Sequence, residues 1–335
     1  MIKYADVIID LQRGDTGKGK VSHSLSNGFE YDYVVRYNGG ANAGHTIYYG
    51  EEKIVTHLIP SGILHGKKCI IGNGCVINIK ALFLEIEMLE SFGIEVRSNL
   101  LIAHNAHITR EIHLEDDSKD VYIGTTKKGV GPTYRDKYMR CGLRAESVDE
   151  LKPFCVDLSE LFYKPEEELK ILFEGAQGFY LDIDWGDYPY VTSSHCSTAS
   201  AFLNGIAPSK LRKVYGICKP YETYVGNKEF QPADDDVLKK LQEVGGEIGA
   251  TTGRVRQVNY LNLDELIKAC NINGVTNLII NKTDILRACN AHKLIHGNKL
   301  INLYNVDKLQ EYVYEWIKSS TDVEVVLWSA NPYSI

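Results

Sequence analysis

Residues 10–21 read Asp-Leu-Gln-Arg-Gly-Asp-Thr-Gly-Lys-Gly-Lys-Val and combine residue types that predict phosphate chemistry. The frame from Gly14 to Lys20 fits the pattern G-x-x-x-x-G-K, follows an apolar run at 7–9 and precedes a predicted helix from 19 to about 25. Two features break this pattern: Val21 replaces the hydroxyl that binds metal in an ordinary loop of this kind, and Asp15 is an acid among phosphate binders. Asp15 repels phosphate unless it binds metal or moves a proton. The alternative is a glycine-rich turn with exposed charges.

A second signature, Asn-Lys-Thr-Asp at 281–284, directly follows the apolar run 278–280. The loop after a strand is where an α/β protein places a base-reading segment. The Asp284 carboxylate can accept hydrogen bonds from both N1–H and the 2-amino group of guanine, an arrangement that adenine does not present. The signature therefore favours GTP over ATP, and the alternative is a polar turn that caps the strand.

Two glycine-rich loops supply further candidates. The loop 39–46 carries Asn42 and His45, and the imidazole could donate a proton or a hydrogen bond to a transferring phosphate. The loop 124–132 offers hydroxyl and N–H groups suited to a monophosphate, and the basic run 135–144 adds positive potential. The alternatives are a structural histidine and a solvated basic face.

The segment Thr251-Thr252-Gly253-Arg254-Val255-Arg256 places two arginines at alternate positions, so an extended loop would project both to one side. That arrangement suits a carboxylate or a phosphate. Gln177 follows another predicted strand and could bind a purine edge or a phosphate, and residues 188–194 predict a rigid turn that presents hydroxyls. The last two features could also be purely structural.

The pattern of elements predicts an α/β fold: one elaborated domain over residues 1–335 with a central, mostly parallel sheet. Short β-rich runs alternate with helical periodicity, and no linker or repeat divides the chain. The predicted strands include residues 33–35, 69–71, 100–102, 171–173, 214–216, 278–280 and 325–327, and the predicted helices include 79–92, 148–162, 235–244, 263–270 and 306–317.

Composition narrows the class of protein. With 44% hydrophobic residues, 24% charged residues and a net charge of -7, the chain is predicted to be globular and not a broad nucleic-acid binder. No apolar stretch is long enough to predict a membrane span. The eight cysteines contain no C-x-x-C pair, and Met1 leads directly into a predicted strand. These features predict a cytoplasmic protein, in the host cytoplasm if the protein is viral.

Together these motifs resemble the adenylosuccinate synthetase family, in particular its short archaeal-type form, from Asp6 to the C-terminus. The resemblance implies a P-loop-like nucleotide site in a ligase that joins L-aspartate to C6 of a purine nucleoside monophosphate. It also implies GTP as co-substrate, Mg2+ as cofactor, and a homodimer in which Arg140 reaches the neighbouring active site.

The resemblance assigns roles to matching positions. The implied catalytic residues are Asp15 as base, His45 as acid and Lys18 on phosphate. The purine nucleotide would be bound by Asn42, Thr126, Arg140, Gln177 and Thr192, and aspartate by Thr251, Thr252 and Arg254. The implied GTP residues are Gly14, Thr16, Gly17, Gly19, Lys20, Arg256, Lys282, Asp284, Ser329 and Pro332, and the implied Mg2+ residues are Asp15 and Gly44.

The implied reaction explains the unusual loop. Asp15 removes the proton from purine N1, the O6 atom then attacks the γ-phosphate, and the amine of aspartate displaces phosphate from C6. An acid in the phosphate loop is then a base, and the hydroxyl missing at Val21 is not required.

The chain also departs from the family pattern. The usual first loop reads Q-W-G-D-E-G-K-G, whereas Arg13 and Thr16 replace Trp and Glu here. The usual T-R-V-G has Tyr224 for Arg, and V-G-W-F-D has become V-N-Y-L-N at 258–262. The D-L-Q start and Thr16 resemble viral 2-aminoadenylosuccinate synthetases, which act on dGMP to supply diaminopurine for phage DNA.

Those viral relatives usually replace the catalytic Asp and lose the guanine reader, yet Asp15 and Asp284 remain here. We interpret the chain as a GTP-using form between the archaeal and viral enzymes. Because the 2-amino group of dGMP lies next to N1, where Asp15 works, the altered loop favours dGMP or GMP as substrate. The alternative is an ordinary enzyme acting on IMP.

Two other classes of protein fit part of the pattern. A GTP-dependent switch would share N-K-x-D, but Val21 and the additional substrate-like loops oppose it. A nucleotide-binding protein without catalysis would fit the altered loop, but Asp15 and His45 oppose it.

Overall fold

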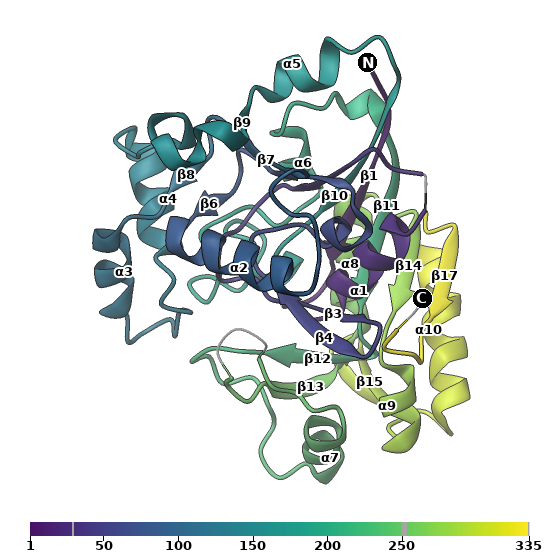
Figure 1. Cartoon of the computed structure of the whole chain (residues 1–335). Helices are drawn as coiled ribbons and strands as arrows, with labels where there is room; N and C mark the ends of the chain where they lie inside the picture. Colours follow the sequence, from purple (N-terminus) through teal and green to yellow (C-terminus); the bar gives the residue numbers. More distant parts are fainter. Residues whose placement is uncertain (29, 250–252, 334) are drawn as a thin grey trace.

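A parallel sheet forms the centre of the computed structural model, which describes residues 1–28, 30–249, 253–333 and 335. Its nine strands lie in the order β17-β14-β11-β1-β10-β2-β5-β7-β9 (Figure 1). Each neighbouring pair is parallel. The strands are β1 (Ile2–Asp10), β2 (Tyr33–Arg36), β5 (Lys68–Ile71), β7 (Leu100–Ala103), β9 (Cys155–Val156), β10 (Leu169–Glu174), β11 (Leu211–Cys218), β14 (Asn277–Ile280) and β17 (Val325–Trp328).

Strand β1 shows why the sequence forms this sheet. Val7, Ile8 and Ile9 are consecutive and all buried, because a strand in a parallel sheet is covered on both faces. β1 pairs with β10 on one side and β11 on the other, from segments more than 160 residues away. The predicted parallel α/β fold and every strand predicted above are confirmed.

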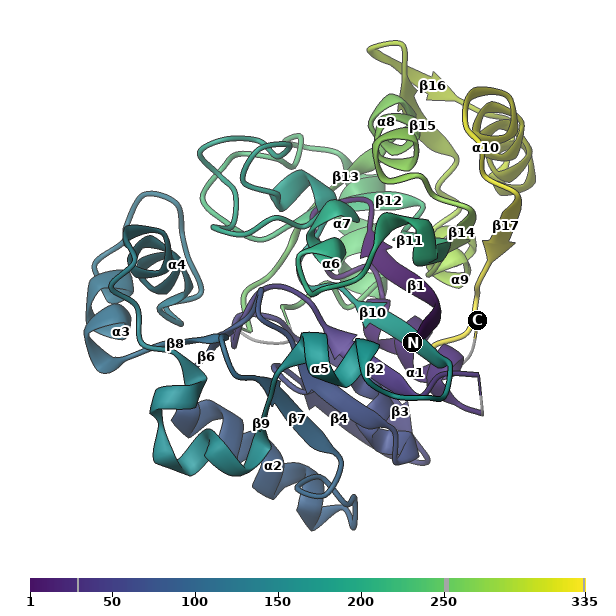
Figure 2. The same ribbon diagram turned by 90° about the horizontal axis from the view of Figure 1, so that it is seen from above.

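Helices lie towards both ends of this sheet. Helices α2, α3 and α4 lie towards the end that holds β7 and β9, and α10 lies beside β17 at the other end, in both Figure 1 and Figure 2. The helices are α1 (Lys18–Ser26), α2 (Ile79–Ser91), α3 (Glu111–Ser118), α4 (Val130–Met139), α5 (Leu158–Tyr163), α6 (Ala199–Phe202), α7 (Asp236–Val244), α8 (Leu263–Asn273), α9 (Thr283–Ala288) and α10 (Val306–Ser320). Short 3-10 helices span Ser61–His65, Ala145–Ser147, Asp149–Phe154, Phe179–Leu181 and Pro208–Lys210.

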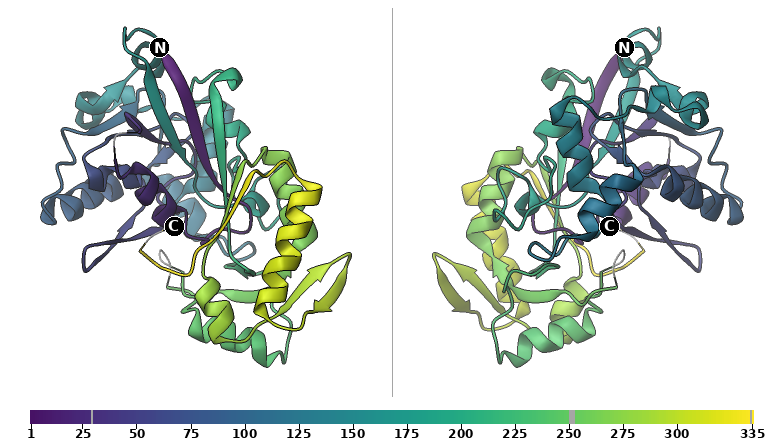
Figure 3. Two further views of the ribbon diagram at one scale, coloured as in Figure 1. Left: turned by 90° about the vertical axis from the view of Figure 1, so that its right-hand side faces the viewer. Right: turned by 90° about the vertical axis from the view of Figure 1, so that its left-hand side faces the viewer.

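Smaller sheets extend the core. One has the order β12-β13-β15-β16, and its β15–β16 hairpin lies beside α10 (Figures 2 and 3). The other two are the hairpin β3–β4 and the pair β6–β8. Their strands are β3 (His45–Tyr49), β4 (Glu52–Thr56), β6 (Val76–Ile77), β8 (His107–Ile108), β12 (Tyr221–Tyr224), β13 (Gln257–Asn262), β15 (Lys293–His296) and β16 (Lys299–Asn302).

The helix predicted over residues 148–162 is wrong. The structure has a 3-10 helix at Asp149–Phe154, then strand β9, then the short helix α5. Pro153 cannot continue an α-helix, and Asp157 starts a new one by accepting hydrogen bonds from the N–H groups of Ser159 and Glu160. The apolar residues of this span are divided between the edge strand β9 and the helix α5 that follows it.

Among the described residues, none of the helices combines the length and apolar character that a membrane crossing requires. The loops at the carboxyl ends of β1, β2, β10 and β14 hold many of the residues singled out from sequence, as expected for an α/β sheet, whereas Thr126, Arg254 and Arg256 lie in other loops.

Candidate active site

A cavity of about 640 Å³ opens where these loops converge. It gathers segments that lie far apart in the sequence, including residues 13–20, 42–46, 123–126, 190–193, 281–282 and 284–285. Most of the residues predicted to bind substrates line it, which supports the prediction of one shared site. The lining residues among them are Gly14, Asp15, Thr16, Gly17, Lys18, Gly19, Lys20, Asn42, Gly44, His45, Thr126, Gln177, Thr192, Arg254, Arg256, Lys282, Asp284 and Pro332.

Asp10, the last residue of β1, organises the phosphate loop from within. Its carboxylate accepts hydrogen bonds from the backbone N–H groups of Gln12 (2.9 Å), Gly14 (3.3 Å) and Thr16 (3.3 Å) and from the Thr16 hydroxyl. Lys18 Nζ lies 3.0 Å from the same carboxylate and donates to the Gln177 carbonyl at 2.6 Å. The loop is therefore held in shape before any phosphate contacts it.

Helix α1 begins at Lys18, after Gly17 with φ of 99°. A side chain at Gly17 would be strained by this φ and would meet the Asn281 amide at 2.7 Å. That amide donates to the Thr16 carbonyl at 2.7 Å, so the 281–284 loop is joined directly to the phosphate loop.

Asp15 lies at one end of a chain of ion pairs. Its Oδ2 atom accepts from Arg256 Nε at 2.9 Å, and Arg256 Nη1 donates to Glu247 Oε2 at 2.6 Å. The other oxygen of Glu247 accepts from Lys282 Nζ at 2.7 Å and from the Tyr221 hydroxyl at 2.6 Å. Buried Glu247 thus connects the base-reading loop to the acid of the phosphate loop.

His45, the first residue of β3, is buried against a second carboxylate. Its Nδ1 atom lies 2.6 Å from Glu174 Oε1, and Arg36 Nη2 lies 2.8 Å from the same oxygen. Burial, followed by the nearby Arg36 charge, lowers the pKa of His45 to about 4, against the opposing effect of Glu174. His45 is therefore neutral near pH 7, and both of its ring nitrogens have buried partners, since Arg36 Nη1 lies 3.0 Å from Nε2.

Arg254 and Arg256 both line the cavity, in agreement with the prediction that they project to one side. Arg254 Nη1 donates to the Gly124 carbonyl at 2.9 Å, which joins this loop to the one that carries Thr126. Thr251 and Thr252, predicted to bind aspartate, lie outside the described residues.

Gln177 presents an amide to the same cavity. Its Oε1 atom is buried and has no hydrogen-bond partner among the described residues, so the geometry leaves it available to a ligand. Asn42 Oδ1 accepts from the Gly40 N–H at 3.1 Å and stiffens its own loop.

Ser329 and Arg140 do not line the cavity. Ser329 is buried and acts through neighbours: its hydroxyl accepts from Lys20 Nζ at 2.7 Å, and its carbonyl accepts from the Thr283 N–H at 3.2 Å. Burial lowers the pKa of Lys20 to about 8. Arg140 lies on the exposed surface at the end of α4, with φ of 64°.

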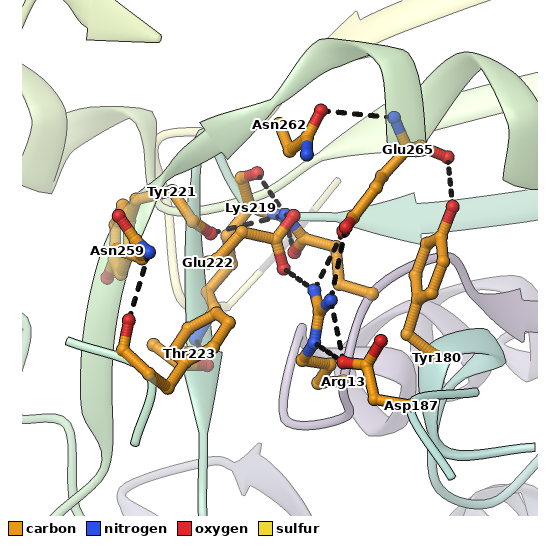
Figure 4. Close-up of polar contacts among 12 residues, drawn as sticks. Arg13, Tyr180, Asp187, Lys219, Tyr221, Glu222, Thr223, Asn259, Asn262 and Glu265 are labelled. Carbon is orange, nitrogen blue, oxygen red and sulfur yellow. Dashed lines mark hydrogen bonds and ion pairs between the residues drawn. The ribbon is translucent and has the colours of Figure 1, made fainter. Parts of the chain in front are cut away.

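The departures from the family pattern do not put new groups against the base. The Thr16 hydroxyl donates to Asp10, and the Arg13 side chain turns to a cluster of acids beside the loop (Figure 4). The expected reshaping of the loop by these residues is therefore indirect.

The residues present fit a magnesium ion. Mg2+ prefers oxygen ligands, and the Asp15 carboxylate and the Gly44 residue line the same cavity. Val21 is buried in the core and the Thr16 hydroxyl is bound to Asp10. Asp15, with 31% of its side chain exposed, is the carboxylate of the phosphate loop that is accessible to a cation.

The sequence predictions missed the buried residues that hold the site together: Asp10, Arg36, Glu174 and Glu247. All four are charged and nearly inaccessible to solvent. Asp10 and Glu174 carried a weak signal, since each is an acid that ends an apolar strand. Glu247 carried none, because its partners Lys219, Arg256 and Lys282 come from separate segments.

Comparisons with known proteins identify the family. The family model described as adenylosuccinate synthetase matches residues 7–148 and 145–327. The chain is 42% identical to the adenylosuccinate synthetase of Thermodesulfovibrio yellowstonii and 41% identical to that of Chlorobium phaeobacteroides. These matches cover 88% and 85% of this chain, and 81% and 77% of those proteins.

Solved structures agree as well. The fully ligated adenylosuccinate synthetase of Plasmodium falciparum matches with a TM-score of 0.83 and 28% identity, covering 99% of this chain and 98% of that one. The succinoaminodeoxyadenylate synthetase PurZ of cyanophage S-2L, solved with dGMP and dATP, matches in fold with a TM-score of 0.73 and 22% identity, covering 94% and 100%. The chain belongs to the adenylosuccinate synthetase family and is a carbon–nitrogen ligase that uses GTP and Mg2+.

Proposed function

We propose that this ligase joins L-aspartate to C6 of dGMP or GMP and so forms the N6-succino derivative of a 2-amino-(deoxy)adenylate, as in the viral diaminopurine pathway. The observation that carries the proposal is the position of the residues that depart from the family pattern. Arg13 and Tyr224, where the family has Trp and Arg, line the cavity beside Asp15. The residues predicted to act on phosphate and to read guanine are unchanged.

The chemistry of Asp15 supports a 2-amino substrate. N1–H and the 2-amino group are adjacent donors on the edge of guanine, and a carboxylate offers two oxygens at matching spacing. Asp15 Oδ2 is held by Arg256 and its side chain faces the cavity, so a substrate bearing both donors would engage both oxygens. IMP offers only the N1–H donor.

Residue roles follow from this assignment. Asp15 accepts the N1 proton, while Lys18 and His45 stabilise charge on the phosphoryl group as it moves to O6. Mg2+, held by Asp15 and Gly44, would neutralise charge on the phosphates. Arg254, with Thr251 and Thr252, holds aspartate, and Gln177, Asn42, Thr126 and Thr192 hold the purine nucleotide.

The oligomeric and cellular assignments are part of the same proposal. Arg140 is exposed at the end of α4 and outside this chain's own cavity, as a residue serving a neighbouring subunit would be. We therefore propose a homodimer, with residues 1–335 as a single catalytic domain in the cytoplasm, or in the host cytoplasm for a viral enzyme.

A second candidate function has its own support. The 42% and 41% identical bacterial relatives are ordinary adenylosuccinate synthetases, whereas the phage PurZ likeness at 22% concerns the fold alone. Conversion of IMP to adenylosuccinate is therefore the alternative.

A panel of IMP, dIMP, GMP and dGMP, each with aspartate, Mg2+ and either GTP or ATP, separates the two. Detection of succinylated product by mass should give kcat/KM at least about tenfold higher for the 2-amino pair, since a hydrogen bond to a charged acceptor contributes about 1.5–3 kcal/mol. Comparing IMP with dIMP, and GMP with dGMP, isolates the sugar from the base. Turnover confined to IMP and dIMP contradicts the proposal and establishes the alternative.

Asp284→Asn should raise the KM for GTP about tenfold, because it removes a charged acceptor for N1–H and the 2-amino group. The KM for ITP, which lacks that amino group, should rise less, so the ratio between the two shrinks. Asp236→Asn is the matched control, since Asp236 is also an exposed acid in the first turn of a helix. An unchanged GTP to ITP ratio would count against the guanine-reading role.

A further inference from the structure

Arg13 lies at the centre of an unusually complete ion-pair cluster beside the Asp15 loop (Figure 4). Its guanidinium reaches Asp187 through Nε (3.1 Å) and Nη2 (3.0 Å), and Glu265 through Nη1 (2.9 Å) and Nη2 (3.3 Å). Nη1 also donates to Glu222 at 3.2 Å. These bonds use all five N–H donors of the guanidinium. Its carbon also lies 4.9 Å from the ring centroid of Tyr180 and 5.0 Å from that of Phe230.

The departures from the family pattern meet at this cluster. Tyr224 packs on Phe230 with ring centroids 5.7 Å apart, and Asn259 Nδ2 donates to the Phe230 carbonyl at 3.0 Å. Asn262 caps helix α8 by accepting from the Glu265 N–H at 3.2 Å. Tyr224, Asn259 and Asn262 therefore each contact a residue, Phe230 or Glu265, that Arg13 also contacts, although position 262 lies 249 residues after position 13.

Two of the partners of Arg13, Asp187 and Glu222, lie in segments that form different walls of the cavity. Asp187 precedes residues 190–193, and Glu222 in β12 precedes Tyr224 and Val225, all of which line the cavity. Gln12 reinforces this second link, since its amide donates to Glu222 Oε1 at 2.9 Å and to the Tyr221 carbonyl at 3.2 Å. One side chain thus joins three segments that enclose the same space.

The loop that follows Arg13 needs such support. Gly14 and Asp15 have φ of 88° and 58°, in the left-handed region that an aspartate adopts only when its surroundings enforce it. Asp10 holds the loop from inside through the N–H groups of Gly14 and Thr16. Arg13 ties down the residue immediately before this pair.

We propose that Arg13 is a positioning residue that fixes the Asp15 loop relative to the segments 187–193 and 222–225, and so sets where the purine base lies against Asp15. The inference rests on the proposed role of Asp15 as the base. It does not depend on which purine the enzyme prefers.

The charges of Arg13 and Glu222 make the two residues depend on each other. Burial raises the pKa of Glu222 to about 7, and Arg13 is the largest influence opposing that rise. A buried carboxylate without its cation is costly, so an arginine at position 13 requires Glu222, and Glu222 requires the arginine. Lysine keeps the charge but cannot reproduce the fork that reaches Asp187 and Glu265 together.

The test compares Arg13→Lys with Arg212→Lys. Arg212 is the matched control, because it makes a two-pronged contact with buried Asp6 and lies over the Tyr4 ring, at the opposite end of β11 from the cavity. Arg13→Lys should lower kcat at least about tenfold, with the KM for GTP within about threefold, because the contacts of Lys20 and Lys282 do not involve Arg13. Arg212→Lys should leave kcat within about twofold at a comparable loss of thermal stability.

Rescue strengthens the test. Arg13→Trp, which restores the family residue, should lose more kcat alone than when combined with Glu222→Gln, because the second change removes the unpaired buried charge. Equal kcat losses for Arg13→Lys and Arg212→Lys overturn the inference. If Arg13→Lys does not fold, Glu222→Gln and Asp187→Asn decide: unchanged kcat in both overturns it.

The outcome is distinguishable from failure of the proposed function. Each variant is assayed on the purine that the wild type converts best, and Asp15→Asn is measured beside it. If Asp15→Asn is inactive while Arg13→Lys behaves like Arg212→Lys, only the positioning role fails. If Asp15→Asn keeps turnover, the proposed base fails whatever Arg13 does.

Discussion

Asp15→Asn is expected to lower kcat by about a thousandfold or more while purine nucleotide binding is retained. An amide cannot accept the N1 proton, and loss of a general base costs on the order of a hundredfold to ten thousandfold. The backbone should not change, because asparagine also tolerates the φ of 58° found at this position. The amide oxygen can still accept from Arg256 Nε. Product formation measured by mass checks the loss of kcat, and calorimetry checks that the purine nucleotide still binds.

Asp234→Asn is the control for this substitution. Asp234 has the same φ of 58° but is exposed and outside the cavity, so the backbone effect of the change is reproduced without the chemistry. Its kcat should stay within about twofold of wild type. Turnover by Asp15→Asn within about tenfold of wild type would refute the assigned role.

Glu247→Gln should destabilise the protein by about 3 kcal/mol and impair turnover as well. Glu247 is buried and pairs with Lys219 at 3.3 Å, Arg256 at 2.6 Å and Lys282 at 2.7 Å. Burial opposes its ionisation, but Lys219, Lys282 and Arg256 outweigh burial and hold its pKa well below the usual value. The neutral variant leaves buried cations without their counter-charge. Denaturant unfolding at pH 7 measures the loss.

The effect of Glu247 depends on pH with a defined sign. Because the folded-state pKa is depressed, the stabilisation is fully present above the usual value of 4.5 and is lost as pH falls towards the lower folded-state value. The difference in the free energy of unfolding between wild type and Glu247→Gln should therefore become smaller below pH 4.5. Glu243→Gln, an exposed change on the same segment, should stay within about 0.5 kcal/mol. A Glu247→Gln protein as stable as this control would contradict the role of Glu247.

Sequence alone was informative where chemistry is local. The strand cores, such as residues 278–280, and the loops around Asp15 and Asp284 were predicted because each motif is contiguous and its residue types limit what it can do. The same reasoning failed at 148–162, where apolar spacing alone did not register the break at Pro153. That residues 1–335 form a single domain stays a prediction.

Residues acting through long-range contacts could not be found in this way. The sequence showed Arg13 only as a departure from the family pattern next to the base. Its partners Asp187, Glu222 and Glu265 follow 174, 209 and 252 positions later in the chain. The role of Glu247 likewise depends on the fold, because β11 and β14 bring Lys219 and Lys282 into contact with it. Pairing between distant segments is set by the fold and is not visible in the spacing of one segment.

Three cations that line the cavity are already engaged with anions of the protein itself. Lys18 is bound to Asp10, Arg256 to Asp15 and Lys282 to Glu247. A nucleotide that enters must therefore exchange partners, in the manner of an ion exchanger, and each phosphate contact replaces an internal one. The net binding free energy from any single contact is therefore small, and free phosphate is expected to bind this site weakly. A ligand set that satisfies several of these groups at once is therefore expected to bind more firmly than any one of its parts.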